Sequence, residues 1–248
     1  MVWIALAVVT GLVGPASAFT EKTQALVTQA DQLLGAPDPS DASLRRAIAL
    51  YEEAADLEPN RMDIHLKLAD AALTMGGWTT GDRRRWFERG RNAAQRAVAL
   101  DKDNPEALFL LAANLGQIAS LEKDLGGLFV PRELERHLSR ALAVNPRHAR
   151  ALHMMAMLLL KTPAPLRVFL NGKASDVEKY LIAATEADPN FSEARLDLAK
   201  YYESQGRVAQ ARAQAQAVVQ MRSPAQTRAW REKHRPAAEA LLKKLPAE

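Results

Sequence analysis

Cysteine is absent from the 248-residue sequence. This absence excludes disulfides, thiolate metal sites and a lipid-modified N-terminal cysteine. Aromatic residues make up only 6% of a chain that is 48% hydrophobic, so small and aliphatic side chains, alanine among them, supply most of the apolar content. Such sequences favour tightly packed helices. The 33 Lys and Arg residues exceed the 29 Asp and Glu residues by only four, with both signs interspersed, which argues against a nucleic-acid-binding protein.

The first 18 residues, MVWIALAVVTGLVGPASA, contain no charged side chain. Their apolar run from Val2 to Val13 is shorter than a membrane span requires, and it is followed by Ala16-Ser17-Ala18, a small-x-small cleavage pattern. We therefore expect residues 1–18 to be a signal peptide cleaved after Ala18, and the mature protein to be periplasmic. The alternative is an uncleaved anchor.

An internal repeat covers most of the remaining chain. Four similar segments begin at Ala54, Ala97, Ala141 and Ala184, at intervals of about 43 residues, and a last interval of about 34 residues leads to Val218. In three of the four segments a proline follows the alanine five residues later; in the second, Lys102 takes its place. The small residue permits close helix approach, and the proline ends the helix.

This pattern resembles tetratricopeptide repeats, and the segment from Phe191 to Val218 fits it best, with Gly206 at the family's turn position. The resemblance implies an all-α, right-handed α-solenoid of antiparallel helix pairs over residues 19–222, with ten to eleven helices in the whole chain. Residues 223–248 are expected to form a basic amphipathic capping helix interrupted at Pro236, because a solenoid needs a terminal polar face.

The intervals exceed the usual repeat length because glycine- or proline-rich inserts separate the two helices of each pair. These inserts are residues 76–81, 121–130 and 162–174. Helix starts follow them at Asp82, at Pro131 and at a predicted capping box from Ser175 to Glu178. Inserts at one repeat position emerge on one edge of a solenoid, which is often a binding edge.

The long repeat, the secretion signal and the mid-chain LAANLG together resemble the T component of TRAP-type transporters over about residues 20–222. The architecture is also similar to that of the regulators of microtubule dynamics. The first resemblance implies a scaffold for small-molecule uptake that works with a periplasmic substrate-binding protein and carries an apolar ligand. Assembly into a homo-oligomer is left open by the sequence.

In tetratricopeptide proteins the first helix of each pair lines the concave surface. Mapping the family positions predicts an apolar groove, with these ligand-binding candidates: Leu66, Leu73, Phe109, Asn114, His153, Met157, Leu160 and Leu196. The same interpretation would explain why residues 107–115 are apolar except for Asn114. The alternative is that the inserts fold back and fill the groove, or that this helix is simply buried.

The sequence lacks clear metal-binding, phosphate-binding and catalytic motifs. The five histidines do not cluster, so we expect no metal site. The stretch GGWTTGD has Asp82 where a phosphate-binding loop needs lysine. No serine or histidine lies in a recognisable catalytic motif, so we expect neither an enzyme nor a cofactor. The arginines from Arg83 to Arg91 are expected to form a solvated face stacking on Trp86. Membrane contact is expected to be limited to weak attraction by the basic C-terminal helix. Two further functions stay open: a protein–protein adaptor in cell-envelope assembly, and a carrier of an apolar ligand that acts alone.

Overall fold

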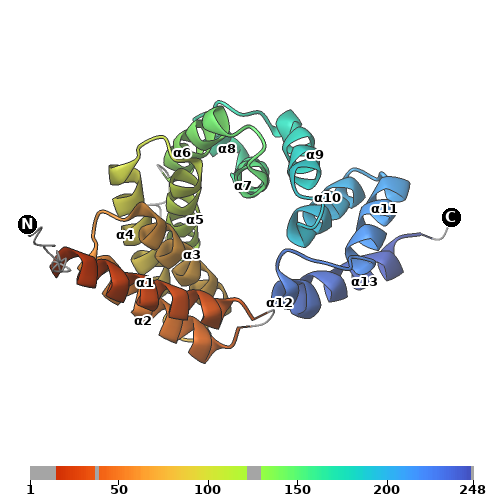
Figure 1. Cartoon of the computed structure of the whole chain (residues 1–248). Coiled ribbons are helices and arrows are strands. Elements are labelled where there is room, and N and C mark those ends of the chain that lie inside the picture. The colour runs from red at the N-terminus through yellow and green to blue at the C-terminus, as the bar shows by residue number, and fades with distance from the viewer. Residues whose placement is uncertain (1–14, 37–38, 122–129, 247–248) are drawn as a thin grey trace, which may run out of the picture.

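The computed structural model describes residues 15–36, 39–121 and 130–246, and within them every regular element is helical. Figure 1 shows a curved row of antiparallel helices. The helices are α1 (Pro15–Leu34), α2 (Asp41–Leu57), α3 (Met62–Trp78), α4 (Arg83–Leu100), α5 (Pro105–Leu121), α6 (Val130–Val144), α7 (Ala149–Lys161), α8 (Ala164–Arg167), α9 (Val177–Ala187), α10 (Ser192–Ser204), α11 (Val208–Val219), α12 (Thr227–Ala229) and α13 (Arg235–Lys244). Eleven of these have ten or more residues, as the repeat predicts.

Successive helices pair as α1–α2, α3–α4, α5–α6, α7–α9 and α10–α11, and each pair packs on the next. This arrangement is the right-handed α-solenoid that the sequence predicts. The first helices α3, α5, α7 and α10 face the centre of the arc in Figure 1. The second helices α2, α4, α6 and α9 lie on its outer side.

The four repeated turns close in the same way. The backbone N–H that follows each second helix donates to the carbonyl of the repeat alanine, at 2.8 to 3.1 Å, and these alanines are fully buried: Ala54, Ala97, Ala141 and Ala184. The turn after Ala97 adopts this geometry although Lys102 replaces the proline. The buried small residue is therefore common to all four turns, and the proline is dispensable.

The apolar helix α5 owes its composition to its surroundings. It packs against α3, α4, α6 and α7, and every residue from Ala107 to Asn114 is buried. Its start is capped by a side chain: Asn104 Oδ1 accepts the N–H of Ala107 at 3.0 Å, and Pro105 occupies the first helical position. Burial among four helices accounts for the missing polar face, as the alternative interpretation proposed.

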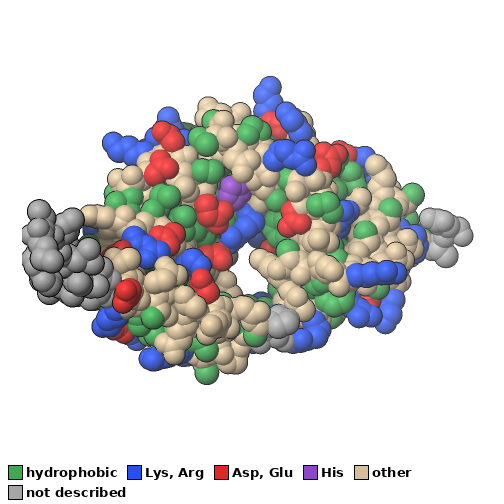
Figure 2. Space-filling view, in the orientation of Figure 1, with side chains coloured by type: hydrophobic (Ala, Val, Ile, Leu, Met, Phe, Trp, Pro, Cys, Tyr) green, Lys and Arg blue, Asp and Glu red, His purple; other side chains and the backbone are tan. Residues whose placement is uncertain are grey.

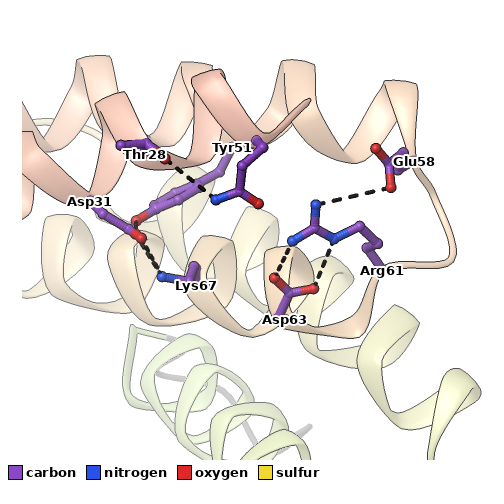
Figure 3. A network of polar contacts seen from close by, with 8 residues as sticks. Thr28, Asp31, Tyr51, Glu58, Arg61, Asp63 and Lys67 are labelled. Carbon is purple, nitrogen blue, oxygen red and sulfur yellow. Dashed lines mark hydrogen bonds and ion pairs between the residues drawn. The ribbon is translucent and has the colours of Figure 1, made fainter. Parts of the chain in front are cut away.

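One carboxylate of α1 contacts both of the next two helices. Asp31 accepts hydrogen bonds from the Tyr51 hydroxyl at 2.6 Å and from Lys67 Nζ at 2.7 Å, as Figure 3 shows. Burial and the neighbouring Asp31 together raise the pKa of Tyr51, so this phenol stays a donor at any physiological pH. The expected cleavage site after Ala18 falls in the first turns of α1, and residues 1–14 of the expected signal peptide lie outside the described residues.

The inserts are less uniform than the sequence suggests. In the first, Gly76 to Trp78 belong to α3, so only residues 79–82 form the connection. The second lies almost entirely outside the described residues. The third, residues 162–174, contains the short helix α8 and returns to the body of the solenoid, where Leu170 is buried.

The capping box predicted at Ser175–Glu178 does not form. Instead, Asp176 accepts the N–H of Lys173 at 2.9 Å, and Glu178 pairs with Arg207 at 2.7 Å. The expectation was wrong because an ion pair with the next repeat competes for the Glu178 carboxylate. By contrast, Asp82 caps α4 as predicted, accepting the N–H of Arg85 at 3.1 Å.

The C-terminal segment is helical from Thr227 to Lys244, with a π-helical stretch at Trp230–His234 just before Pro236. The prediction of an interruption at Pro236 is thus corrected to a local widening. A wider turn relieves the clash between the proline ring and the preceding carbonyls. The segment caps the solenoid, with Trp230 Nε1 donating to the carbonyl of Val218 at 2.8 Å and Lys244 pairing with Glu203 at 2.7 Å.

This cap also reaches the other end of the molecule. Arg228 forms an ion pair with Asp41 at the start of α2 at 3.1 Å, and its guanidinium lies 4.1 Å from the ring centroid of Trp78. Lys233 Nζ lies 3.7 Å from the same centroid. The arc therefore closes into a ring around a central opening, which is visible in Figure 2.

Candidate functional site

The concave face, formed by α3, α5, α7 and α10, is the candidate site. At its centre three successive first helices are joined through Arg150 of α7. Its guanidinium binds Asp70 of α3 at 2.5 Å and Glu106 of α5 at 3.2 Å. These contacts show that side chains of the three helices meet on one surface, and that its centre is ionic.

Phe109 lies beneath this ionic centre. The Arg150 guanidinium stacks 4.4 Å from the Phe109 ring centroid, and the His148 ring centroid lies 5.3 Å away. Only 5% of Phe109 is exposed. Phe109 therefore packs beneath the charged layer, and its side chain is not accessible to a ligand as part of an open groove.

His148 is fixed in one tautomer by its neighbours. Its Nδ1 accepts the N–H of Ala151 at 3.2 Å, which assigns a proton to Nε2, and this nitrogen donates to Glu106 at 2.9 Å. Burial by itself raises the pKa of Glu106, but the His148 hydrogen bond and the Arg150 charge outweigh it and leave the pKa below its usual value. Glu106 is thus a permanently charged acceptor at neutral pH.

A second polar cluster joins α7 to α10. His153 donates from Nε2 to Asp197 at 2.9 Å, Lys200 reaches the other carboxylate oxygen at 3.1 Å, and the His153 ring meets Phe191 edge-on at 5.1 Å. Burial acts to raise the pKa of Asp197, yet the His153 and Lys200 interactions lower it overall. His153 is therefore engaged within the fold. Asp197 is not among the predicted groove residues, because the repeat pattern does not show which polar side chains pair across helices.

The other groove candidates differ in how much of each residue is exposed to solvent. Leu66, Leu73 and Met157 are half-buried, and 41% of Leu160 is exposed. Leu196 is a core residue with 3% exposure. Met157 and Leu160 therefore follow Arg150 and His153 in one stripe of side chains along α7, and they form its accessible apolar end.

Asn114 lies elsewhere. Its side chain is fully buried, donates from Nδ2 to the carbonyl of Leu110 at 2.9 Å, and points to α4. A Cβ atom built on Gly90 of α4 would lie 2.2 Å from Asn114 Oδ1. The prediction that Asn114 lines the concave groove is therefore corrected, because the side chain fills the close contact between two helices.

Two hollows in the described surface lie on the outer side, between successive second helices. One, of about 400 Å³, is bounded by α6, α7 and α9 and includes Leu142, Pro146 and Tyr180. The other, of about 340 Å³, is bounded by α2, α3 and α4 and includes Pro59 and Arg96. Pro59 and Pro146 are equivalent repeat residues, so both hollows arise from the same packing of neighbouring pairs.

The arginines of α4 stack on its aromatic residues in part. Arg89 stacks on Trp86 and Arg83 on Phe87, with guanidinium-to-centroid distances of 4.9 and 5.6 Å. Arg45 of α2 lies on the same Trp86 ring at 5.4 Å. Among the described residues, no group of three or more His, Asp or Glu side chains is placed to hold a metal ion. No helix in the described ranges is long and apolar enough to cross a membrane.

Comparison with known proteins agrees with this architecture. The family model described as regulator of microtubule dynamics protein 1-3 matches residues 26–160, which is more than half of the chain. The chain belongs to this family. A tetratricopeptide repeat model matches residues 171–226 of this regulator of microtubule dynamics family member. No curated protein gives a significant match.

Solved structures similar to this regulator of microtubule dynamics family member support the fold. The thermophilic tetratricopeptide protein TTC0263 of Thermus thermophilus is 19% identical, with a TM-score of 0.64, and the match covers 87% of this chain and 98% of that one. PilF of Pseudomonas aeruginosa is 15% identical with a TM-score of 0.58, covering 90% of both chains. The chain is thus a tetratricopeptide-type protein-binding module, a fold that generally serves as a non-enzymatic scaffold.

Proposed function

We propose that this protein is a scaffold whose concave face receives a segment of a periplasmic partner protein, and that the partner is a substrate-binding protein of a TRAP-type transporter. The observation that carries the proposal is the Arg150 contact with both Asp70 and Glu106. It places charged groups from three repeats in fixed positions along one surface. Such preorganised groups are suited to recognising a partner, because little ordering is needed on binding.

The accessible end of the same stripe supplies apolar contact. Met157 is half-buried and Leu160 is 41% exposed, next to the ionic centre. A partner segment that covers both would pair its polar groups with the charged centre and bury apolar atoms against α7. Mixed surfaces of this kind are typical of specific protein interfaces.

The test measures binding of the full-length protein to purified substrate-binding proteins encoded beside its gene, by biolayer interferometry. Leu160→Glu should weaken binding about tenfold or more, because a charge would be buried against apolar atoms of the partner. The matched control is Leu100→Glu, since Leu100 is also 41% exposed but ends a second helix, α4. It should bind like the parent protein.

Equal affinities of Leu160→Glu, Leu100→Glu and the parent would contradict the concave-face proposal. If the substrate-binding proteins fail to bind while a cell-envelope protein binds with the expected sensitivity to Leu160→Glu, the adaptor function replaces the transporter role. In that case the concave face keeps its assignment and only the partner class changes.

A further inference from the structure

The third insert exposes two adjacent apolar side chains. Val168 is 74% exposed and Phe169 is 58% exposed, more than the other large apolar side chains in the described part of the chain. Isolated exposed apolar residues are normal on protein surfaces, but two large neighbours at the tip of one connection require an explanation.

The tip is held firmly by the solenoid. Glu135 of α6, only 3% exposed, accepts the backbone N–H groups of Asn171 and Gly172, each at 2.8 Å, and Leu170 is buried beside it. On the other side, Arg167 Nε donates to the carbonyl of Thr162 at 2.8 Å. Since both flanks are anchored, Val168 and Phe169 are displayed in a fixed position.

The insert itself is basic, and the Glu135 carboxylate that anchors it is buried beneath it. Residues 161–173 contain Lys161, Arg167 and Lys173 and no acidic residue. The next carboxylate, Asp176, accepts the N–H of Lys173. In the orientation of Figure 1, Lys and Arg side chains project furthest from the edge of the molecule between α8 and α9, with Asp and Glu side chains beside them (Figure 2).

We propose that this insert docks the protein on an anionic membrane surface. Val168 and Phe169 enter the interfacial region of the bilayer, and the three cationic side chains meet lipid phosphates. Apolar tips combined with basic flanks are the features that bind peripheral proteins to such surfaces. Two side chains are too small for a stable protein interface, which needs about 800 Å² on each partner.

This site differs from the concave face and from the basic C-terminal helix, which the sequence favoured for membrane attraction. Binding at the insert would leave the Arg150 centre untouched, so the two proposals can fail independently. The insert lies between α7 and α9, on the edge of the solenoid.

The test is flotation of the full-length protein with vesicles of phosphatidylcholine, alone or with about 30% phosphatidylglycerol. The parent should float mainly with the anionic vesicles. The double variant Val168→Ser and Phe169→Ser should bind them about tenfold more weakly, because interfacial burial of the two side chains is lost. All variants carry the same N-terminal segment, so a difference between them belongs to the insert.

Val144→Ser is the matched control, because Val144 is 51% exposed at the end of α6. It should float like the parent, and circular dichroism should show that every variant is folded. The proposal is overturned if the parent does not prefer anionic vesicles, or if the insert variant binds them like the parent. Loss of binding in Lys243→Gln with Lys244→Gln would then assign the membrane contact to the C-terminal helix. It is equally overturned if the insert variant changes only the oligomeric state in light scattering, which would make a second copy the occupant.

Discussion

Single residues set how closely the helices approach. Gly90 and Asn114 show this best, because the missing Cβ of one residue leaves room for the side chain of the other. Asn114 is fully buried, and its Oδ1 has no hydrogen-bond partner in the structure. The contact therefore combines an unsatisfied acceptor with close packing of α4 on α5.

We expect Gly90→Ala to lower the free energy of unfolding by about 1–3 kcal/mol, because the added methyl overpacks the contact. In the Asn114→Ala background the same substitution should cost much less, since the side chain that it meets is gone. Thermal unfolding of the four proteins of this double-mutant cycle measures the coupling, with roughly 2–4 °C per kcal/mol for a chain of this size. Additive effects would show that the two residues do not share a contact.

At the scale of elements, the C-terminal helical segment depends on a buried histidine. His234, 8% exposed in the π-helical stretch, shares a 2.8 Å hydrogen bond between its Nδ1 and Ser192 Oγ of α10. Burial lowers the pKa of His234 and outweighs the opposite effect of Glu193 and Asp197. The folded protein therefore favours the neutral ring, whereas the unfolded chain takes up a proton near pH 6.5.

This shift predicts that the free energy of unfolding decreases as the pH falls below about 6.5, because His234 then binds a proton more readily in the unfolded state than in the folded state. For this one group the loss between pH 7.5 and 5.5 has an upper bound of about 1.4 kcal/mol, which applies if the folded ring stays neutral throughout. Denaturant unfolding of the parent and of His234→Gln at both pH values measures it. The variant should lose less stability than the parent, and parallel losses would refute the assignment to His234.

At the scale of the whole molecule, two cations on Trp78 close the solenoid. The contacts of Arg228 and Lys233 with Trp78, and of Arg228 with Asp41, connect the last helical segment to α2 and α3. Solenoids bury their cores only between neighbouring repeats, so this contact between the ends is additional to the stability of the stack. It also encloses the concave face.

Ring opening can be followed by fluorescence, since the chain has no cysteine of its own. A bimane label on Gln226→Cys, an exposed position beside Arg228, should be quenched by Trp78 in the closed ring. Adding Arg228→Ala and Lys233→Ala should raise the emission of the label, because the ring then opens and the label moves away from Trp78. Exposed cation–π contacts and ion pairs contribute only about 1 kcal/mol each, so removing them together is enough to shift the equilibrium between closed and open ring. In a Trp78→Phe background the emission should be higher than in the parent and insensitive to these changes, because Trp230, whose backbone N–H donates to the carbonyl of residue 226, quenches the label equally in every protein. Quenching that persists unchanged without Trp78 would argue against ring closure.

The sequence by itself determined the all-α class, the repeat period and most helix ends. These features depend on groups within a few residues of one another, such as Asn104 with Ala107, or on small residues that recur with the repeat, such as Ala54 and Ala141. Local prediction failed where a residue distant in sequence competed for the same side chain. Glu178, for example, pairs with Arg207 and does not form the predicted capping box. The same limitation explains Asn114, whose position depends on a glycine in another helix.

Only the tertiary structure decided which concave residues are accessible and where the chain ends meet. The repeat placed Phe109, Met157 and Leu160 on one surface, but the Arg150 layer that covers Phe109 requires side chains from three repeats. Ring closure depends on the curvature accumulated over every helix pair, and no single repeat encodes it. Sequence periodicity therefore fixes the unit and its neighbours, whereas contacts between distant units determine the surface that a partner meets.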